Sequence, residues 1–172
     1  MNSIYQFTIP VFIKSLKALD GVLAKAQVYV EEKGLNEAAL LEERLAPDMF
    51  PFVKQVQVAC DNAKGAAARL SGTEIPSHPD EEKSLAELRA RIAKTLEYLA
   101  TITEVSFEGA ETRQATLPYF PGKFMSGLDY AREYALPNFF FHVTTAYAIL
   151  RKHGATIGKA DYMGGLPLQD MN

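Results

Sequence analysis

The chain has 172 residues, of which 48% are hydrophobic and 23% charged, so it is long enough for one sizeable core and short for two domains. A formal net charge of −3, with no local cluster of lysine and arginine, gives no attraction to nucleic acid or to anionic lipid. The first residues do not have the basic-then-apolar layout expected of a signal peptide, and no run of roughly 18 apolar residues occurs. The single cysteine, Cys60, fits a reducing compartment. We therefore expect one cytoplasmic domain over residues 1–172 that binds neither nucleic acid nor membrane.

The first predicted element is a long helix from Ile4 to about Glu32. Pro10 should bend this helix or mark its real start, and Gly34 should end it. Residues 36–44 then predict a turn or two of helix. Apolar residues recur at helical spacing along the first element, at Phe7, Val11, Leu16, Leu19, Leu23, Ala26 and Val30.

A second helix should follow Asp48, whose carboxylate can cap it, with Pro51 in its first turn. Its helical phase places Gln55 and Asn62 at one border of the buried stripe. It sends Gln57 outward beside Lys64. Cys60 is better explained as a small core residue than as a nucleophile. The buried stripe consists of Phe52, Val56, Ala59, Ala63, Ala66 and Leu70, and its alanines allow a close helix neighbour.

Residues 71–80 contain two prolines and a glycine, so they predict a loop that crosses the end of the molecule, with His78 in solvent. Ser84 and Glu87 match the capping-box pattern for a third helix that ends near Thr103. Its stripe comprises Leu85, Leu88, Ile92, Leu96, Leu99 and Ile102.

Helical periodicity is lost between residues 104 and 134, where Pro121-Gly122 indicates a β-hairpin or an irregular segment. A last helix should start near Pro137 and stop at Gly154, followed by an irregular tail whose Tyr162 and Met163 pack against the helices. Amphipathic helices of this kind bury their stripes by packing together. The predicted fold class is all-α, a four-helix bundle with a short hairpin or irregular segment between helices 3 and 4.

The last helix carries an ionisable residue, His142, in the least polar run of the chain, PNFFFHVTTAYAILR. At 100° per residue, Asn138 and His142 share one inward sector of this helix, and Gln55 can face them from the second helix. These three residues are the candidates for a polar pocket. Three interpretations of His142 stay open: a hydrogen-bonded core residue, a small-molecule contact, or a metal ligand.

The order of these elements resembles the DinB-like four-helix bundles. The stretches RLAPDMFPFVKQVQVACDNAKGAAARL and ALPNFFFHVTTAYAILRKHG are similar to a branch of that superfamily labelled as domains of unknown function. The resemblance covers nearly the whole chain. It implies a metal site of three histidines, one on the second helix and two in an H-x-x-x-H pair on the last helix. Some relatives are thiol-dependent transferases or isomerases that use a metal.

In this chain the family's histidine positions fall on Gln55, Asn138 and His142, so one of three ligands remains. Neutral amides are poor replacements for imidazole around zinc and similar ions. The resemblance therefore indicates a degenerate metal site. We expect no cofactor and no bound metal, with His142 as the ligand if any metal binds.

The first functional hypothesis is a small-molecule-binding or scaffold protein without a functional metal site. The alternative is a metal- or thiol-dependent transferase or isomerase that uses His142 with a divalent metal such as zinc or nickel. A second alternative is a stress or DNA-damage-related protein. No nucleophile–base pair occurs, so the sequence leaves open whether the chain is an enzyme. A homodimer is expected because apolar residues point from the last helix in several directions, namely Phe139, Phe140, Phe141, Tyr147 and Leu150.

Overall fold

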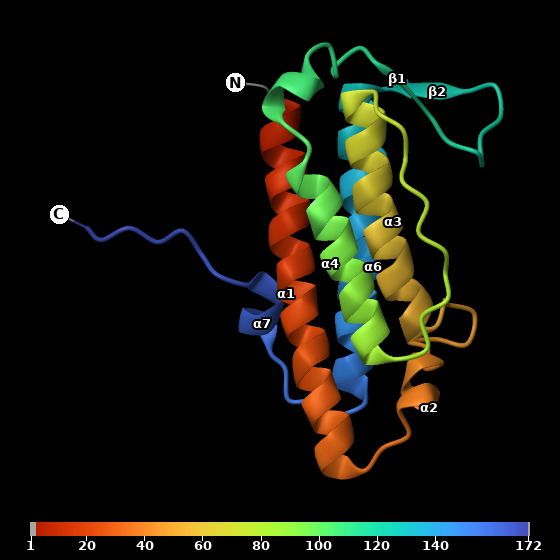
Figure 1. The fold of residues 1–172 in the computed structure, drawn as a ribbon, viewed down its shortest axis with the longest axis vertical. Helices are drawn as coiled ribbons and strands as arrows, with labels where there is room; N and C mark the ends of the chain where they lie inside the picture. Colours follow the sequence, from red (N-terminus) through yellow and green to blue (C-terminus); the bar gives the residue numbers. More distant parts are fainter. Residues whose placement is uncertain (1–2, 172) are drawn as a thin grey trace.

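The computed structural model describes residues 3–171, which form a bundle of four long helices (Figure 1). Around the bundle the order is α1, α4, α3, α6, and each helix packs against the next in this ring. The predicted all-α bundle is confirmed, and one continuous apolar core joins the four helices. The long helices are α1 (Ser3–Lys33), α3 (Phe52–Ser71), α4 (Leu85–Ala100) and α6 (Leu136–Lys152). No helix within the described residues combines the length and apolar character needed to span a bilayer.

The N-terminal part of the bundle follows the sequence prediction closely. Pro10 lies inside α1 with an exposed side chain and does not mark its start. The left-handed backbone of Gly34 ends the helix, as expected. The short helix α2 (Glu37–Leu41) is capped by Asn36, whose side chain accepts a hydrogen bond from the Ala39 amide at 3.2 Å.

The start of α3 differs from the prediction. The helix begins at Phe52, and Pro51 is its N-cap residue, so Asp48 lies in the preceding turn and does not cap it. The Phe52 amide donates instead to the carbonyl of Glu43 at 2.7 Å, which connects the new helix to the end of α2. The predicted stripe of α3 is buried throughout.

Residues 72–84, which we call the strap, contradict the predicted end-crossing loop. Figure 1 shows that α3 and α4 run in the same direction, and that the strap returns along the length of the bundle beside α3. Parallel neighbouring helices require such a crossover connection. The strap covers a face of α3 that would otherwise meet water, so Gln57 and Lys64 are only 4% and 5% exposed. The prediction that these two side chains point outward is therefore wrong.

Arg91 on α4 holds the strap in place. Its side chain is 1% exposed and donates to Glu82 at 2.9 Å, to the Pro79 carbonyl at 3.0 Å and to Asp61 of α3 at 2.7 Å. Asp80 completes the set of carboxylates around the guanidinium, at 2.9 Å. The predicted cap of α4 is confirmed, because the Ser84 hydroxyl accepts from the Glu87 amide at 3.1 Å.

A short hairpin and an unexpected helical segment follow α4 and the single turn η1 (Glu104–Phe107). Strands β1 (Gln114–Thr116) and β2 (Phe124–Ser126) pair antiparallel with Ala115 opposite Met125, which confirms the hairpin. The chain then becomes helical at once, in α5 (Gly127–Asp129) and the π-helical turn η2 (Tyr130–Ala135), and continues into α6. The segment before Pro137 is thus not irregular, and the last helix gains two turns.

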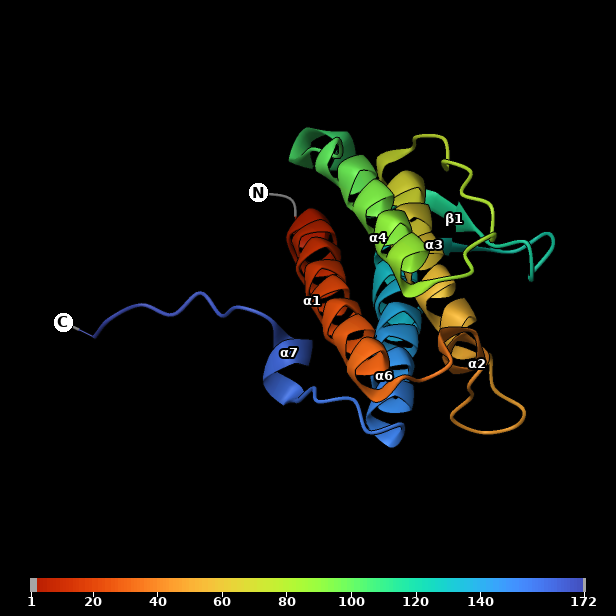
Figure 2. The same cartoon turned by 60° about the horizontal axis from the view of Figure 1, so that its bottom comes forward.

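The C-terminal segment packs on the bundle through the buried residues Ala155 and Ile157 and through its helix α7 (Lys159–Met163). Lys25 of α1 pairs with Asp161 at 2.7 Å. Tyr162 meets Tyr147 edge to face at 5.7 Å and contacts the Thr144 hydroxyl at 2.9 Å. Beyond α7 the chain extends away from the bundle (Figures 1 and 2).

Candidate functional site

The structure brings two of the three predicted site residues together. His142 on α6 and Gln55 on α3 are 7% and 1% exposed, and His142 Nδ1 lies 2.7 Å from Gln55 Oε1. The Gln55 amide nitrogen donates to the Phe50 carbonyl at 3.0 Å, so its oxygen is the acceptor and the imidazole carries its proton on Nδ1. Burial lowers the pKa of His142. A role of this pair in ligand binding stays a prediction.

Asn138 does not join this pair. The residue is half-buried, and no hydrogen bond within residues 3–171 connects its side chain to Gln55 or His142. It borders a different cavity, one that also receives Asn62 of α3. The predicted three-residue group is therefore divided between a closed histidine–glutamine contact and an open cavity.

The residues around His142 do not fit a metal. Its Nδ1 atom donates to Gln55, and a metal at Nε2 would need further anionic or imidazole ligands. In the part of the chain that the structure describes, no group of three or more His, Cys, Asp or Glu side chains could hold an ion. Cys60 supplies no ligand either, since burial raises the pKa of its thiol to about 12.

The cavity, which we call the strap cavity, has a volume of about 470 Å³ and lies between α3, the strap, the residues that follow β1 and the start of the last helix. This volume falls in the range of small-molecule sites. Polar and aromatic side chains converge on it from elements that are far apart in sequence. The lining residues used below are Asn62, Lys64, Arg69, Tyr130, Tyr134 and Asn138.

Asn62 is the clearest sign of an unmet interaction in this cavity. It is 8% exposed, and its Oδ1 atom has no hydrogen-bond partner among the described residues. A buried polar atom without a partner is destabilising, and few occur in a native protein. His78 of the strap repeats the pattern with a buried, unpaired Nδ1, which corrects the prediction that it is a solvated residue.

The π-helical turn η2 presents two tyrosines to the cavity. Pro137 explains this turn, because its ring would collide with the Glu133 carbonyl in α-helical register and it has no N–H to donate. The Leu136 amide bonds five residues back, to Ala131, which is the π pattern. In this geometry Tyr130 and Tyr134 stack at 5.8 Å with an angle of 21°. Isolated π turns are rare in proteins, and those that occur often lie at functional sites.

Burial also controls the chemistry of these phenols. It raises the pKa of Tyr130, which is 1% exposed, although the charge of Arg69 partly offsets the effect. The pKa of Tyr134 is raised as well, by burial first and by Tyr119 second. Both phenols are therefore neutral hydrogen-bonding groups near neutral pH.

Sequence reasoning missed most of the strap cavity. Asn62 was placed on the border of the stripe, but nothing near it in sequence indicates the strap that covers it. Tyr130 and Tyr134 lay in a segment predicted to be irregular. One local signal was available, since Ser126 and Asp129 match a helix cap and the Ser126 hydroxyl accepts from the Asp129 amide at 3.1 Å.

Comparison with known proteins agrees with the fold. The family described as domain of unknown function (DUF1993) matches residues 4–163. The crystal structure of a DinB family member protein from Shewanella denitrificans is 44% identical, with a TM-score of 0.93 over 97% of this chain and 95% of that chain. A comparison with curated proteins gave no match. The chain therefore belongs to the DUF1993 family of DinB-like proteins, whose function is unknown.

Proposed function

We propose that this protein binds a small molecule in the strap cavity and has no functional metal site. The observation that carries the proposal is the buried, unpaired Oδ1 atom of Asn62 beside a cavity of about 470 Å³. A ligand that donates a hydrogen bond there would satisfy an atom that the protein leaves without a partner. The π turn and the stacked tyrosines support the same location, because they give the cavity a rigid aromatic wall.

Fragment screening by NMR tests this proposal. We expect ligands to perturb the backbone amide of Gly65, which lies in the cavity wall one turn after Asn62. In an Asn62→Leu variant, which keeps the branched shape of the side chain and removes the acceptor, polar fragments should bind more weakly while the fold is retained. Gln27→Leu, an amide replacement on the surface of α1, should leave binding unchanged. Fragments that bind only outside the cavity, or bind Asn62→Leu equally well, would refute the proposal.

The enzyme alternatives are less well supported by these residues. His142 is buried against Gln55, and among the described residues no carboxylate pairs with it as a catalytic partner. A transferase or isomerase that uses a metal would need ligands that this pair does not supply. The DNA-damage alternative rests on family resemblance alone, and the net charge of −3 argues against DNA binding.

We also infer that the protein forms a homodimer through an apolar patch beside the histidine–glutamine pair. Phe50 and Phe141 are each 52% exposed, and they flank this pair, because Phe50 accepts from Gln55 and the Phe141 ring meets His142 at 5.2 Å. Large contiguous apolar patches are uncommon on the surface of monomers. Helix α7 covers Tyr147 but not this patch.

Light scattering over a concentration series tests the dimer. We expect twice the chain mass of 19.0 kDa at high micromolar protein, and a shift toward the monomer in Phe141→Ser. Tyr119→Ser, which removes an aromatic ring that is 76% exposed on the hairpin connection, is the control. A mass that stays at 19.0 kDa would contradict the inference.

A further inference from the structure

We propose that the strap cavity selects an aromatic monocarboxylate, bound with its carboxylate at Arg69 and a hydrogen-bond donor at Asn62. This inference rests on the proposed function and adds the chemical class of the ligand. It follows from the charges around the cavity, the path of the Arg69 side chain and the distance between the two polar groups.

The ion pairs beside the strap form one cluster, and Arg69 does not belong to it. Three cations and three carboxylates form one connected cluster, consisting of Lys54, Lys64 and Arg91 with Asp61, Asp80 and Glu82. Arg69 belongs to no ion pair within the described residues, and its hydrogen bonds go to the carbonyls of Thr116 at 2.9 Å and Gly65 at 3.1 Å. The cavity therefore has one positive charge that no carboxylate neutralises, which favours a monoanion as ligand.

Gly65 gives the guanidinium its position in the cavity wall. A Cβ atom at this residue would lie 2.7 Å from Arg69 Nη1, so a side chain there would displace the guanidinium. In the present position Arg69 Cζ lies 6.0 Å from the centre of the Tyr130 ring. The cation is thus held beside an aromatic wall, where a carboxylate and an aromatic ring of one ligand can both be accommodated.

The other polar group of the site is Asn62, one helical turn before Gly65, to whose carbonyl the Arg69 guanidinium donates. Three residues correspond to about 4.5 Å along a helix. A planar molecule with a carboxylate and a hydroxyl in meta positions of one ring can span this short separation, with its ring against the stacked pair Tyr130 and Tyr134. Its hydroxyl would donate to the unpaired Oδ1 of Asn62.

Two probes of equal shape test the proposal, 3-hydroxybenzoate and its neutral analogue 3-hydroxybenzamide. We expect NMR titrations to show that the carboxylate binds at least about tenfold more tightly than the amide, because a charge-assisted hydrogen bond is lost in the amide. Arg69→Gln should abolish this preference. Gly65→Ala should weaken carboxylate binding without unfolding the protein, since alanine favours the helix and only a flexible side chain must move.

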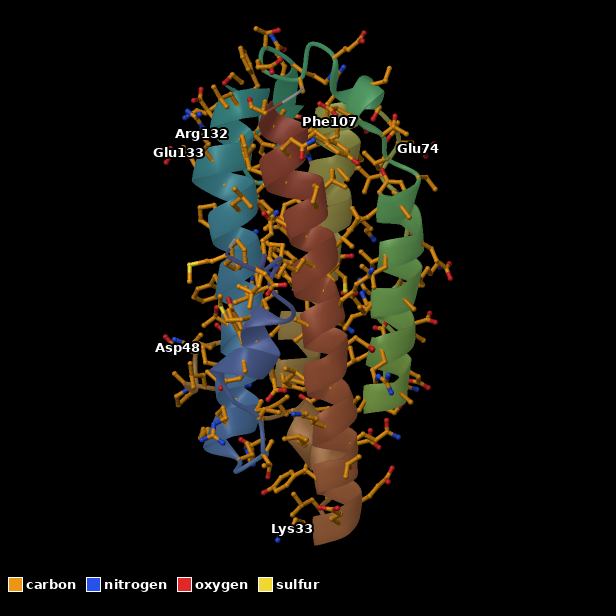
Figure 3. The ribbon with its side chains drawn as sticks, turned by 90° about the vertical axis from the view of Figure 1, so that its left-hand side faces the viewer. Lys33, Asp48, Glu74, Phe107, Arg132 and Glu133 are labelled. Atoms are coloured by element: carbon orange, nitrogen blue, oxygen red, sulfur yellow. The ribbon has the colours of Figure 1, made fainter. Side chains whose placement is uncertain are left out.

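Arg132→Gln is the matched control, because it removes the same charge from the outer side of η2, where Figure 3 shows Arg132 pointing away from the bundle. This variant should keep the preference for the carboxylate. If both probes bind at the cavity with equal affinity, the proposed ligand class is wrong and small-molecule binding stands. If neither probe perturbs the cavity, the ligand class is wrong, and fragment screening decides the proposed function separately.

Discussion

Replacement of Arg91 by methionine should release the strap from the bundle. Arg91 is the most deeply buried charge in the cluster, with a side chain that is 1% exposed. Its hydrogen bonds connect α4 to the strap residue Glu82 and to Asp61 on α3. Methionine has a similar length and keeps the apolar contacts of the stem, so the change isolates the loss of the guanidinium.

The size of the destabilisation depends on the carboxylates that remain without a cation after the substitution. Removal of one partner from a buried ion pair destabilises a protein by about 3–5 kcal/mol, because the other charge stays buried and unpaired. Here the remaining carboxylates of Asp61, Asp80 and Glu82 are 38%, 35% and 12% exposed, so water screens two of them. We therefore expect the lower end of the range, about 3 kcal/mol, or a fall in melting temperature of roughly 6–12 °C.

The same cluster predicts the pH dependence. Burial alone would raise the pKa values of Asp80 and Glu82, but hydrogen bonds from Lys54, Arg91 and Gln57 and the charge of Arg91 outweigh it, so both pKa values are lowered. A carboxyl with a lowered pKa in the folded state stabilises the protein above its unfolded pKa, about 4, and loses this effect as the pH falls through the folded value. The difference between wild type and Arg91→Met should therefore shrink below about pH 4.

Urea denaturation at pH 7 and at several values down to pH 3 measures both effects. Arg89→Met is the control, since Arg89 lies on the same helix and pairs with Asp20 on the surface, where the two side chains are 38% and 34% exposed. Loss of that pair should cost less than about 1 kcal/mol. If Arg91→Met is no more destabilising than Arg89→Met, or if its effect is independent of pH, the assignment of Arg91 as the anchor of the strap is wrong.

Three further predictions concern the start of α5, the histidine–glutamine pair and the metal content. Gly127→Ala should lower the free energy of unfolding by at least about 3 kcal/mol in chemical denaturation, because its Cβ would lie 1.9 Å from the Ala110 carbonyl oxygen. The control Gly21→Ala, where the added Cβ meets open space, should stabilise the protein by up to about 1 kcal/mol. Equal effects of the two substitutions would contradict the close contact at Gly127. Gln55→Leu should cost about 1–3 kcal/mol by leaving the N–H of His142 without an acceptor, and an unchanged midpoint would argue against the hydrogen bond. Elemental analysis of protein purified without a metal-affinity resin should find well under one equivalent of transition metal, and stoichiometric zinc or nickel bound by His142 would contradict this.

The sequence by itself determined the fold class and the contact between Gln55 and His142. Hydrophobic periodicity of 3.6 residues identifies the buried face of each long helix, and this face sets which side chains can meet inside a bundle. Local capping chemistry determined the start of α4 at Ser84, because a cap depends on residues within one turn. The hairpin was predictable for the same reason, from the turn residues at Pro121-Gly122.

Only the tertiary structure decided where the strap runs and what it covers. A loop of prolines and polar residues carries no periodic signal, so its path along α3 depends on distant partners, above all Arg91. That path buries Asn62 and Lys64, which any single-helix pattern assigns to the border or to the surface. The stacked tyrosines depend on the π turn, which arises from Pro137 inside a helix that continues through it. The strap cavity therefore depends on contacts between residues far apart in sequence, whereas the helices of the bundle that supports it follow from local hydrophobic periodicity and capping.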